Sequence, residues 1–392
     1  MKVHIVSIVS LLLSVFLDIL PIEVQARIPG NDFRVTVPYV ESGGKLMVKV
    51  LVNGVEGHFL IDTGAPCCVT GTFARKAGIE ADSARTVDVQ DSNGALASTH
   101  LVELAELKLN PSVSFTRLEA VLWEPGHLME QFGVDGIIGY NLFRRGAIQF
   151  DATQRTFTFA SSVDKLSVDY TTAIPLVNDR FLALLQVNLG GGACDTVMFD
   201  SGASAFYEIS ALSLDRLEKK GKKAVRVLGS GSGILSFGAA GLEDGSLKKR
   251  VCLPDFSLGR ARFRDVTSVT TDAPNSRMGS ALLQHGALTI DYLGRMAYFL
   301  PNERRAVNLY EKDWDVVITV MNDSLCAGLV WDYAKLPLKG GERIVAVNGQ
   351  RFGQVNMQEA LTKGLLHMPG DKARITYLDA TGKECEVTIR KR

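Results

Sequence analysis

The segment HFLIDTGA at residues 58–65 has a counterpart 138 positions later, TVMFDSGA at residues 196–203. A second pair of segments repeats with an offset of 140: GYNLFRRGAIQFD at residues 139–151 and GSALLQHGALTID at residues 279–291. Two segments that recur in the same order and at nearly the same spacing indicate a duplicated structural unit. The sequence therefore predicts two related halves within one chain.

We expect the halves to span residues 27–165 and 166–305, followed by a third domain at residues 306–392 that does not repeat. Both halves contain short runs of apolar and β-branched residues, such as residues 46–52 and 181–187, punctuated by Asn-Gly and Gly-rich turns. No long helical periodicity runs through either half. The predicted fold class is therefore mostly β.

Residues 1–26 have the features of a secretory signal peptide. A basic start precedes a mostly apolar run at residues 5–20, and residues 24–26 have the small-residue spacing of a cleavage site. The run is short and is interrupted by Asp18, which disfavours a transmembrane helix. We expect cleavage near Ala26 and an exported protein, periplasmic or secreted, with no stable membrane span; a buried or anchoring helix is the alternative.

The composition excludes some classes of function. The 392 residues contain 43 Lys and Arg against 43 Asp and Glu, so the net charge is zero, which argues against a general nucleic-acid binder. Hydrophobic residues make up 46%, as in an ordinary packed globule. The six Cys and six His are scattered without a C-x-x-C motif, so we expect no metal site and no cofactor.

Each half places an aspartate at the end of an apolar run, followed by a small hydroxyl residue and a glycine. The two loops are Asp62, Thr63, Gly64 and Asp200, Ser201, Gly202. Two such carboxyl groups, related by the repeat, can meet across its axis, where they share one proton because both cannot ionise. The ionised acid then takes a proton from a water while the protonated acid hydrogen-bonds a carbonyl oxygen. This is general acid–base hydrolysis of an amide.

These segments resemble the motifs of aspartic peptidases of the retropepsin-like kind. The first half matches with DTGA at residues 62–65 and with IIG at residues 137–139. The second half matches with DSGA at residues 200–203, but Arg277 stands where the family has an apolar residue. The resemblance covers the two predicted halves and leaves residues 306–392 aside.

The resemblance implies a mostly β fold with two pseudo-symmetric acid-protease lobes and an aspartic endopeptidase that acts on a peptide or protein substrate. Asp62 and Asp200 are then the catalytic acids, and neither a metal nor another cofactor is needed. The expected support of the catalytic loops comes from Thr63, Gly64, Ser201 and Gly202. The alternative is a catalytically inactive peptide-binding protein on the same scaffold.

Family members also close a glycine-containing flap over the substrate. Candidates lie about 30 residues past each aspartate: Asn93 and Gly94 in the first half, and Gly231 and Gly233 in the second. We expect the second candidate to be a mobile glycine-rich tip that contacts substrate. A plain surface hairpin is the alternative for each.

The third domain resembles a PDZ domain of the kind attached to exported bacterial proteases. A strand at residues 314–320, GERIVAVNG at residues 341–349, a short helix at residues 354–366 and a final hairpin at residues 369–390 carry this resemblance. It implies a small β-rich domain that accepts extended peptides such as protein C-termini. A packing module that steadies the protease is the alternative.

Overall fold

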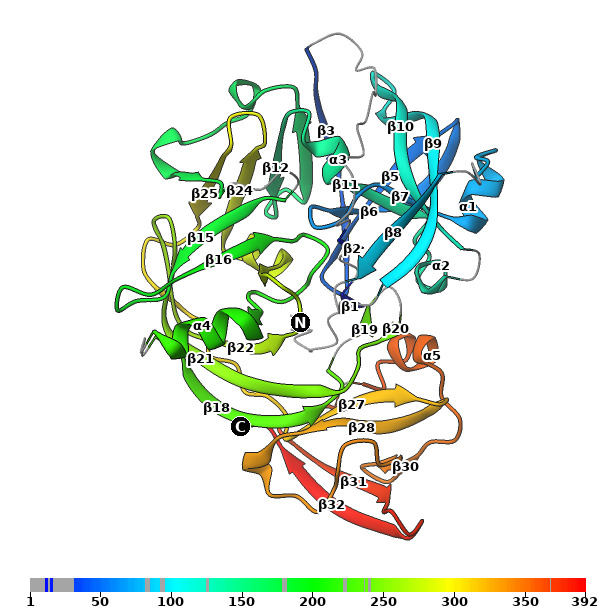
Figure 1. The fold of residues 1–392 in the computed structure, drawn as a ribbon, viewed down its shortest axis with the longest axis vertical. Helices are drawn as coiled ribbons and strands as arrows, with labels where there is room; N and C mark the ends of the chain where they lie inside the picture. The colour runs from blue at the N-terminus through cyan, green and yellow to red at the C-terminus, as the bar shows by residue number, and fades with distance from the viewer. Residues whose placement is uncertain are drawn as a thin grey trace.

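The computed structural model describes residues 11–12, 15–16, 32–81, 85–91, 96–124, 127–177, 182–220, 224–235, 237–238, 241–366 and 368–392. The chain is mostly β, as the sequence predicts. In Figure 1 the first half (27–165, blue to green) lies beside the second half (166–305, green to yellow), and the C-terminal module (306–392, orange to red) lies below them. These three boundaries remain predictions. Asn93, Gly94 and the expected cleavage site near Ala26 lie outside the described residues.

The first half is built on a nine-stranded sheet with the order β2-β8-β9-β10-β7-β11-β6-β5-β4. Strand β2 (Val15–Phe16) comes from the segment that precedes this half. The other strands are β4 (Val40–Ser42), β5 (Lys45–Val52), β6 (Val55–Asp62), β7 (Cys68–Thr70), β8 (Thr86–Asp91), β9 (Leu96–Asn110), β10 (Val113–Trp123) and β11 (Gly136–Gly139). Asn53 and Gly54 connect β5 to β6 with positive φ angles of 50° and 81°, the backbone of a tight hairpin turn. Strand β11 runs parallel to β6 and sets Gly139 opposite Asp62.

The second half repeats this arrangement on an eight-stranded sheet, in which β17-β22-β21-β15-β16-β23 form the main path. Its strands are β15 (Leu184–Asn188), β16 (Cys194–Phe199), β17 (Ile209–Ser210), β18 (Arg226–Gly233), β21 (Ser246–Leu258), β22 (Ala261–Thr271), β23 (Ser276–Met278) and β26 (Val307–Asn308). Strand β23 runs parallel to β16 and sets Met278 opposite Phe199. The strands that lead to the two aspartates, β6 and β16, are therefore each paired with a parallel neighbour in the same way.

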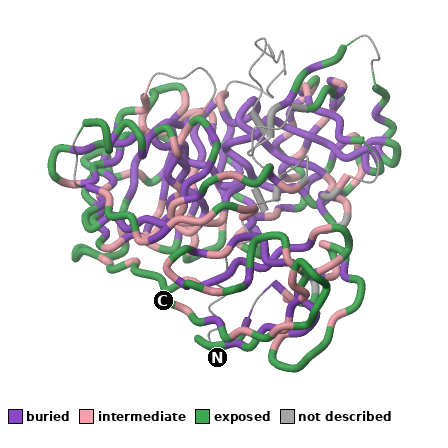
Figure 2. Tube along the Cα trace, turned by 60° about the horizontal axis from the view of Figure 1, so that its bottom comes forward, coloured by how far each residue is buried: buried purple, intermediate pink, exposed green. Residues whose placement is uncertain are grey.

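A six-stranded sheet joins the halves in the order β14-β25-β24-β12-β13-β3. The first half supplies β3 (Arg34–Pro38), β12 (Ala147–Asp151) and β13 (Thr156–Ala160), and the second supplies β14 (Ala173–Pro175), β24 (Gly286–Asp291) and β25 (Met296–Pro301). At its centre β12 pairs antiparallel with β24, from Ala147 opposite Asp291 to Phe150 opposite Leu288. The repeated segments thus lie next to each other, and one apolar core continues through both halves, as the buried interior in Figure 2 shows.

The helices are short. They are α1 (Gly71–Lys76), α2 (Leu128–Gln131), α3 (Tyr140–Phe143), α4 (Ala211–Lys219) and α5 (Met357–Thr362), with 3₁₀ turns at Val163–Lys165, Tyr170–Thr172, Ser280–His285 and Asp332–Ala334. Ser210 caps α4 by accepting a hydrogen bond from Leu212 N. Across the described ranges, no helix is both long enough and apolar enough to cross a bilayer.

The C-terminal module has its own apolar core. It contains β27 (Val316–Met321), β28 (Ser324–Val330), β29 (Ile344–Val347), β30 (Gln350–Arg351), β31 (Lys372–Leu378) and β32 (Glu384–Arg390). Asn348 and Gly349 form the turn into β30 with φ angles of 51° and 84°, as the Asn-Gly signal predicts. The sequence did not indicate strand β28, which pairs with β27. Strand β26 pairs with β22 of the second half, so the chain leaves that half only after Asn308.

Two short strands that precede the first half, β1 (Leu11–Leu12) and β2, add to hairpins of the two halves. β19 (Phe237–Gly238) pairs with β20 (Gly241–Leu242), and β1 adds parallel to β19. The neighbouring β2 adds to β8.

The glycine run at residues 229–233 is not the mobile tip that we expected. It lies in β18, which pairs along its length with β21 and packs against β28. A Cβ on Gly231 would lie 2.6 Å from Val330 O, and one on Gly233 would lie 2.1 Å from Gly328 O. The run therefore lets the C-terminal module approach β18 closely; substrate contact by Gly231 and Gly233 remains a prediction.

Gly233→Ala tests this packing. The added methyl overlaps a backbone carbonyl that cannot rotate away, so we expect a loss of about 1–3 kcal/mol in the free energy of unfolding, measured by urea denaturation. Gly245→Ala is the matched control, because its Cβ would meet nothing closer than 3.9 Å. Equal stability of the two variants would contradict the close packing.

Candidate active site

The structure brings Asp62 and Asp200 together at the centre of the molecule. Asp62 ends β6, Asp200 directly follows β16, and both are fully buried. Each carboxyl group packs against the glycine of the opposite loop: a Cβ on Gly64 would lie 2.8 Å from Asp200 Cγ, and one on Gly202 would lie 2.4 Å from Asp62 Cγ. Only glycine leaves room for two carboxyl groups to face each other here.

Backbone N–H groups hold one oxygen of each carboxyl group. Gly64 N donates to Asp62 Oδ1 at 2.8 Å, and Gly202 N donates to Asp200 Oδ1 at 2.9 Å. Asp62 Oδ2 accepts no hydrogen bond from an N–H or O–H donor of the described residues. Its side-chain contact with Asp200 can be a hydrogen bond only when one of the two carboxyl groups is protonated. The geometry therefore favours a pair that shares one proton.

The electrostatics agree with a shared proton. Burial, followed by the negative charge of Asp200, raises the pKa of Asp62 well above its usual range. The Gly64 N–H and the ammonium group of Lys45 oppose this rise in the pKa. The protonated form of Asp62 is therefore favoured beside an ionised Asp200.

Lys45 reaches this site from the start of β5. It is buried, and its Nζ donates to Gly202 O in the loop of the other half. Burial lowers the pKa of Lys45, while the negative charges of Asp200, Asp62 and Glu208 oppose this change in the pKa. When protonated, this ammonium group favours the ionised form of the aspartates.

The two loops are locked by hydrogen bonds exchanged between the halves. Thr63 Oγ1 donates to Phe199 O at 2.8 Å and accepts from Ser201 N at 3.0 Å. Ser201 Oγ donates to Ile61 O at 2.8 Å and accepts from Thr63 N at 3.0 Å. All four bonds are buried, so the hydroxyls of Thr63 and Ser201 fix the loops relative to each other; support of catalysis by these residues remains a prediction.

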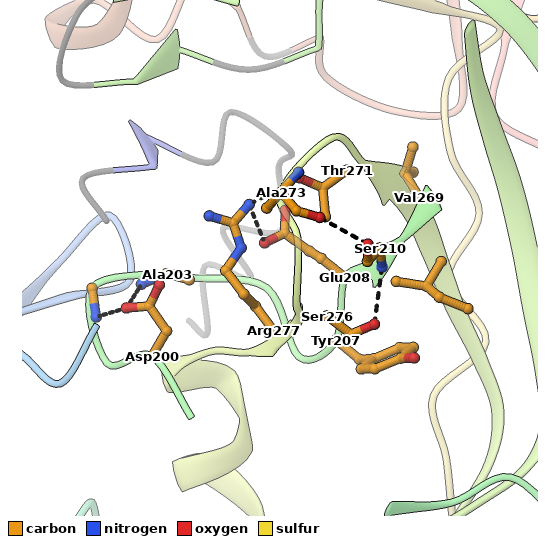
Figure 3. Close-up of polar contacts among 12 residues, drawn as sticks. Asp200, Ala203, Tyr207, Glu208, Ser210, Val269, Thr271, Ala273, Ser276 and Arg277 are labelled. Carbon is orange, nitrogen blue, oxygen red and sulfur yellow. Dashed lines mark hydrogen bonds and ion pairs between the residues drawn. The ribbon is translucent and has the colours of Figure 1, made fainter. Parts of the chain in front are cut away.

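The walls beside the two aspartates differ in chemistry. Next to Asp62, Leu60 and Ile137 belong to a buried apolar cluster that also contains Val89, Leu101, Val121, Trp123 and Met129. Next to Asp200, Arg277 is fully buried, and its Nη2 lies 3.4 Å from Glu208 Oε2 (Figure 3). The sequence singled out Arg277 as a departure from the family pattern, but Lys45 and Glu208 were missed.

The potential metal ligands of the described ranges do not cluster. Among the described residues, no group of three or more His, Cys, Asp or Glu side chains is placed to hold a metal ion. The six cysteines all lie in described ranges and are free, and four of them are buried: Cys67, Cys68, Cys252 and Cys326. Most of the cysteines therefore serve as small buried side chains.

Comparison with known proteins finds a similarity to one protein family. The model of the family described as aspartyl protease matches residues 48–142. This range includes β6 with Asp62 and β11 with Gly139, and it ends before Asp200. No curated protein matches the chain. The match shows that residues 48–142 are similar to the aspartyl protease family, and it supports a peptidase at that level only.

Replacing Thr63 tests the lock between the loops. Thr63→Val keeps the shape of the side chain but leaves Phe199 O and Ser201 N buried without their partner, so we expect a loss of about 1–3 kcal/mol in the free energy of unfolding. Thr63→Ser keeps the hydroxyl and should retain most of the stability. Chemical denaturation of both variants measures this difference, and a Val variant as stable as the Ser variant would rule out the lock.

Replacing Lys45 tests the charge beside the aspartates. Because Lys45 lowers the pKa of Asp62, Lys45→Met should raise the pKa of Asp62 and shift the pH–rate profile of peptide cleavage to higher pH. Lys49→Met is the matched control: Lys49 lies on the same strand but is exposed and pairs with Glu56. An unchanged profile, or a shift to lower pH, would contradict this role of Lys45.

Proposed function

We propose that the protein is an exported aspartic endopeptidase with two lobes in one chain, in which Asp62 and Asp200 activate a water molecule to hydrolyse peptide bonds. The observation that supports this most directly is the pair of buried carboxyl groups, each packed against the glycine of the opposite loop. The matched aspartyl protease domain contains one of these acids. Because both lobes belong to one chain, catalysis needs no second copy.

In this mechanism the proton resides on Asp62, whose pKa is raised, and the negative charge resides on Asp200 beside Lys45. Asp200 takes a proton from the water as its oxygen attacks the peptide carbonyl carbon, while Asp62 donates its proton to the carbonyl oxygen. The tetrahedral intermediate then collapses. The C–N bond breaks, Asp200 gives its proton to the leaving amine, and Asp62 regains a proton from the hydroxyl group of the intermediate.

The proposal extends to both ends of the chain. The signal-like residues 1–26 support export to the periplasm or the outside of the cell. The C-terminal module, with its Asn348-Gly349 turn and final hairpin β31–β32, supports a PDZ-like domain that accepts an extended peptide such as a protein C-terminus. The substrate of the catalytic site is a peptide or protein chain.

Single substitutions of the aspartates test the catalytic step. Asp62→Asn and Asp200→Asn nearly keep the size of the side chain but remove the shared proton, so we expect cleavage of a peptide library to fall by about 10²–10⁴-fold or more. Asp215→Asn is the control, because Asp215 is exposed on α4 and forms an ion pair with Lys219. A peptide that carries a statine-type hydroxyl unit should inhibit the wild-type protein.

The inactive peptide-binding protein is the competing outcome. A wild-type protein that binds peptides from the library but cleaves none of them between pH 3 and pH 8 would exclude the endopeptidase. Cleavage that survives both aspartate substitutions would exclude the proposed mechanism.

A further inference from the structure

The repeat places Ile137 and Arg277 at equivalent positions beside the two aspartates. Ile137 on β11 is the parallel partner of Leu60, and Arg277 on β23 is the parallel partner of Met198. Each partner precedes its aspartate by two residues. Because side chains alternate along a strand, both Ile137 and Arg277 lie on the face of the sheet that carries the nearby aspartate. The second half therefore presents a cation where the first half presents an apolar side chain.

Arg277 is only partly satisfied within the protein. Its Nη2 donates to Thr271 Oγ1 at 3.3 Å and lies 3.4 Å from Glu208 Oε2. Its Nε and Nη1 are buried and meet no acceptor among the described residues. Figure 3 shows the side chain leaving β23 between Asp200 and Glu208, with its guanidinium group beside Glu208 and Thr271. Buried N–H groups of a cation without acceptors are costly, so this position can gain from an acceptor that a ligand supplies.

Lys45 adds a second cation to the same region. It lies close enough to interact electrostatically with Glu208 and Arg277 as well as with the aspartates. The charged groups that we place beside this subsite are Lys45, Arg277 and Glu208, together with the catalytic pair. The negative charges of Glu208 and of the singly protonated pair balance the two cations, so an acidic group is favoured here by the unpaired N–H groups of Arg277 and not by an excess of positive charge.

We propose that Arg277, assisted by Lys45, forms a subsite that accepts the carboxylate side chain of an Asp or Glu residue next to the scissile bond, on the Asp200 side. This inference rests on the proposed peptidase function and narrows its substrate class to peptides with an acidic residue at that position. The Ile137 side takes an apolar residue. Selectivity then arises because a substrate carboxylate supplies the acceptor that Arg277 Nε and Nη1 lack.

The experiment compares peptides that differ at one residue. After a library digest locates the cleavage site, matched peptides carry Glu, Gln or Leu at each position that flanks the scissile bond. For the wild type at one of these positions, we expect kcat/KM for Glu to exceed that for Gln and for Leu by about tenfold or more. Equal values for Glu and Gln at both positions would overturn a carboxylate subsite.

Substitutions then test whether Arg277 causes the preference for a Glu residue in the peptide. Arg277→Met should reduce the Glu-to-Leu ratio of kcat/KM by about tenfold or more, whereas Arg304→Met, which removes an exposed arginine, should leave the ratio unchanged. Glu208→Gln removes the opposing carboxylate and should increase the ratio, which keeps the inference testable if Arg277→Met does not fold. A ratio unaffected by Arg277→Met, or lowered by Glu208→Gln, would overturn the subsite.

Binding separates this inference from the peptidase proposal. Fluorescence polarisation measures the affinity of the same labelled peptides for the Asp62→Asn protein, which does not depend on turnover. Tighter binding of the Glu peptide without any cleavage by the wild type would refute the peptidase and keep the subsite. Cleavage without preference for Glu, together with equal binding of the three peptides, would refute the subsite and keep the peptidase.

Discussion

The site depends on holding two buried carboxyl groups together at the centre of the molecule. Burial penalises the charged form of Asp62, and the charge of Asp200 penalises a second ionisation. Such a pair persists only if the surrounding chain fixes it, since both loops would otherwise relax apart. The exchange of hydrogen bonds between Thr63 and Ser201 supplies that constraint, because each hydroxyl joins the backbone of the other half.

The duplication explains why the two aspartates are held in the same way and why their neighbouring side chains can differ. Parallel pairing of β6 with β11 and of β16 with β23 gives the two aspartates equivalent supports, and the pairing of β12 with β24 places the repeated segments side by side. The side chains beside the aspartates are free to diverge, because they do not maintain that pairing. Ile137 and Arg277 have diverged, so two symmetrically held aspartates have different buried neighbours.

Features with local causes could be predicted from the sequence, and features created by tertiary docking could not. The Asn53-Gly54 turn and the repeated segments indicated the hairpins and the relation between the halves. Lys45 gave no such signal: Lys49, on the same face of β5, is exposed, and Lys45 is buried through its contact with Gly202 in the other half. The glycines of β18 have the composition of a loop, but their role follows from the approach of a strand about 100 residues later.

The contact between the second half and the C-terminal module has the character of an internal interface. Arg250 on β21 is buried and donates to Tyr333 Oη, Arg392 O and Glu311 O. All three acceptors belong to the C-terminal module, so these charge-assisted hydrogen bonds tie the module to β21. Because β21 also pairs with β15, and β15 with the strand that leads to Asp200, the docked module restrains the same sheet that positions one of the two acids.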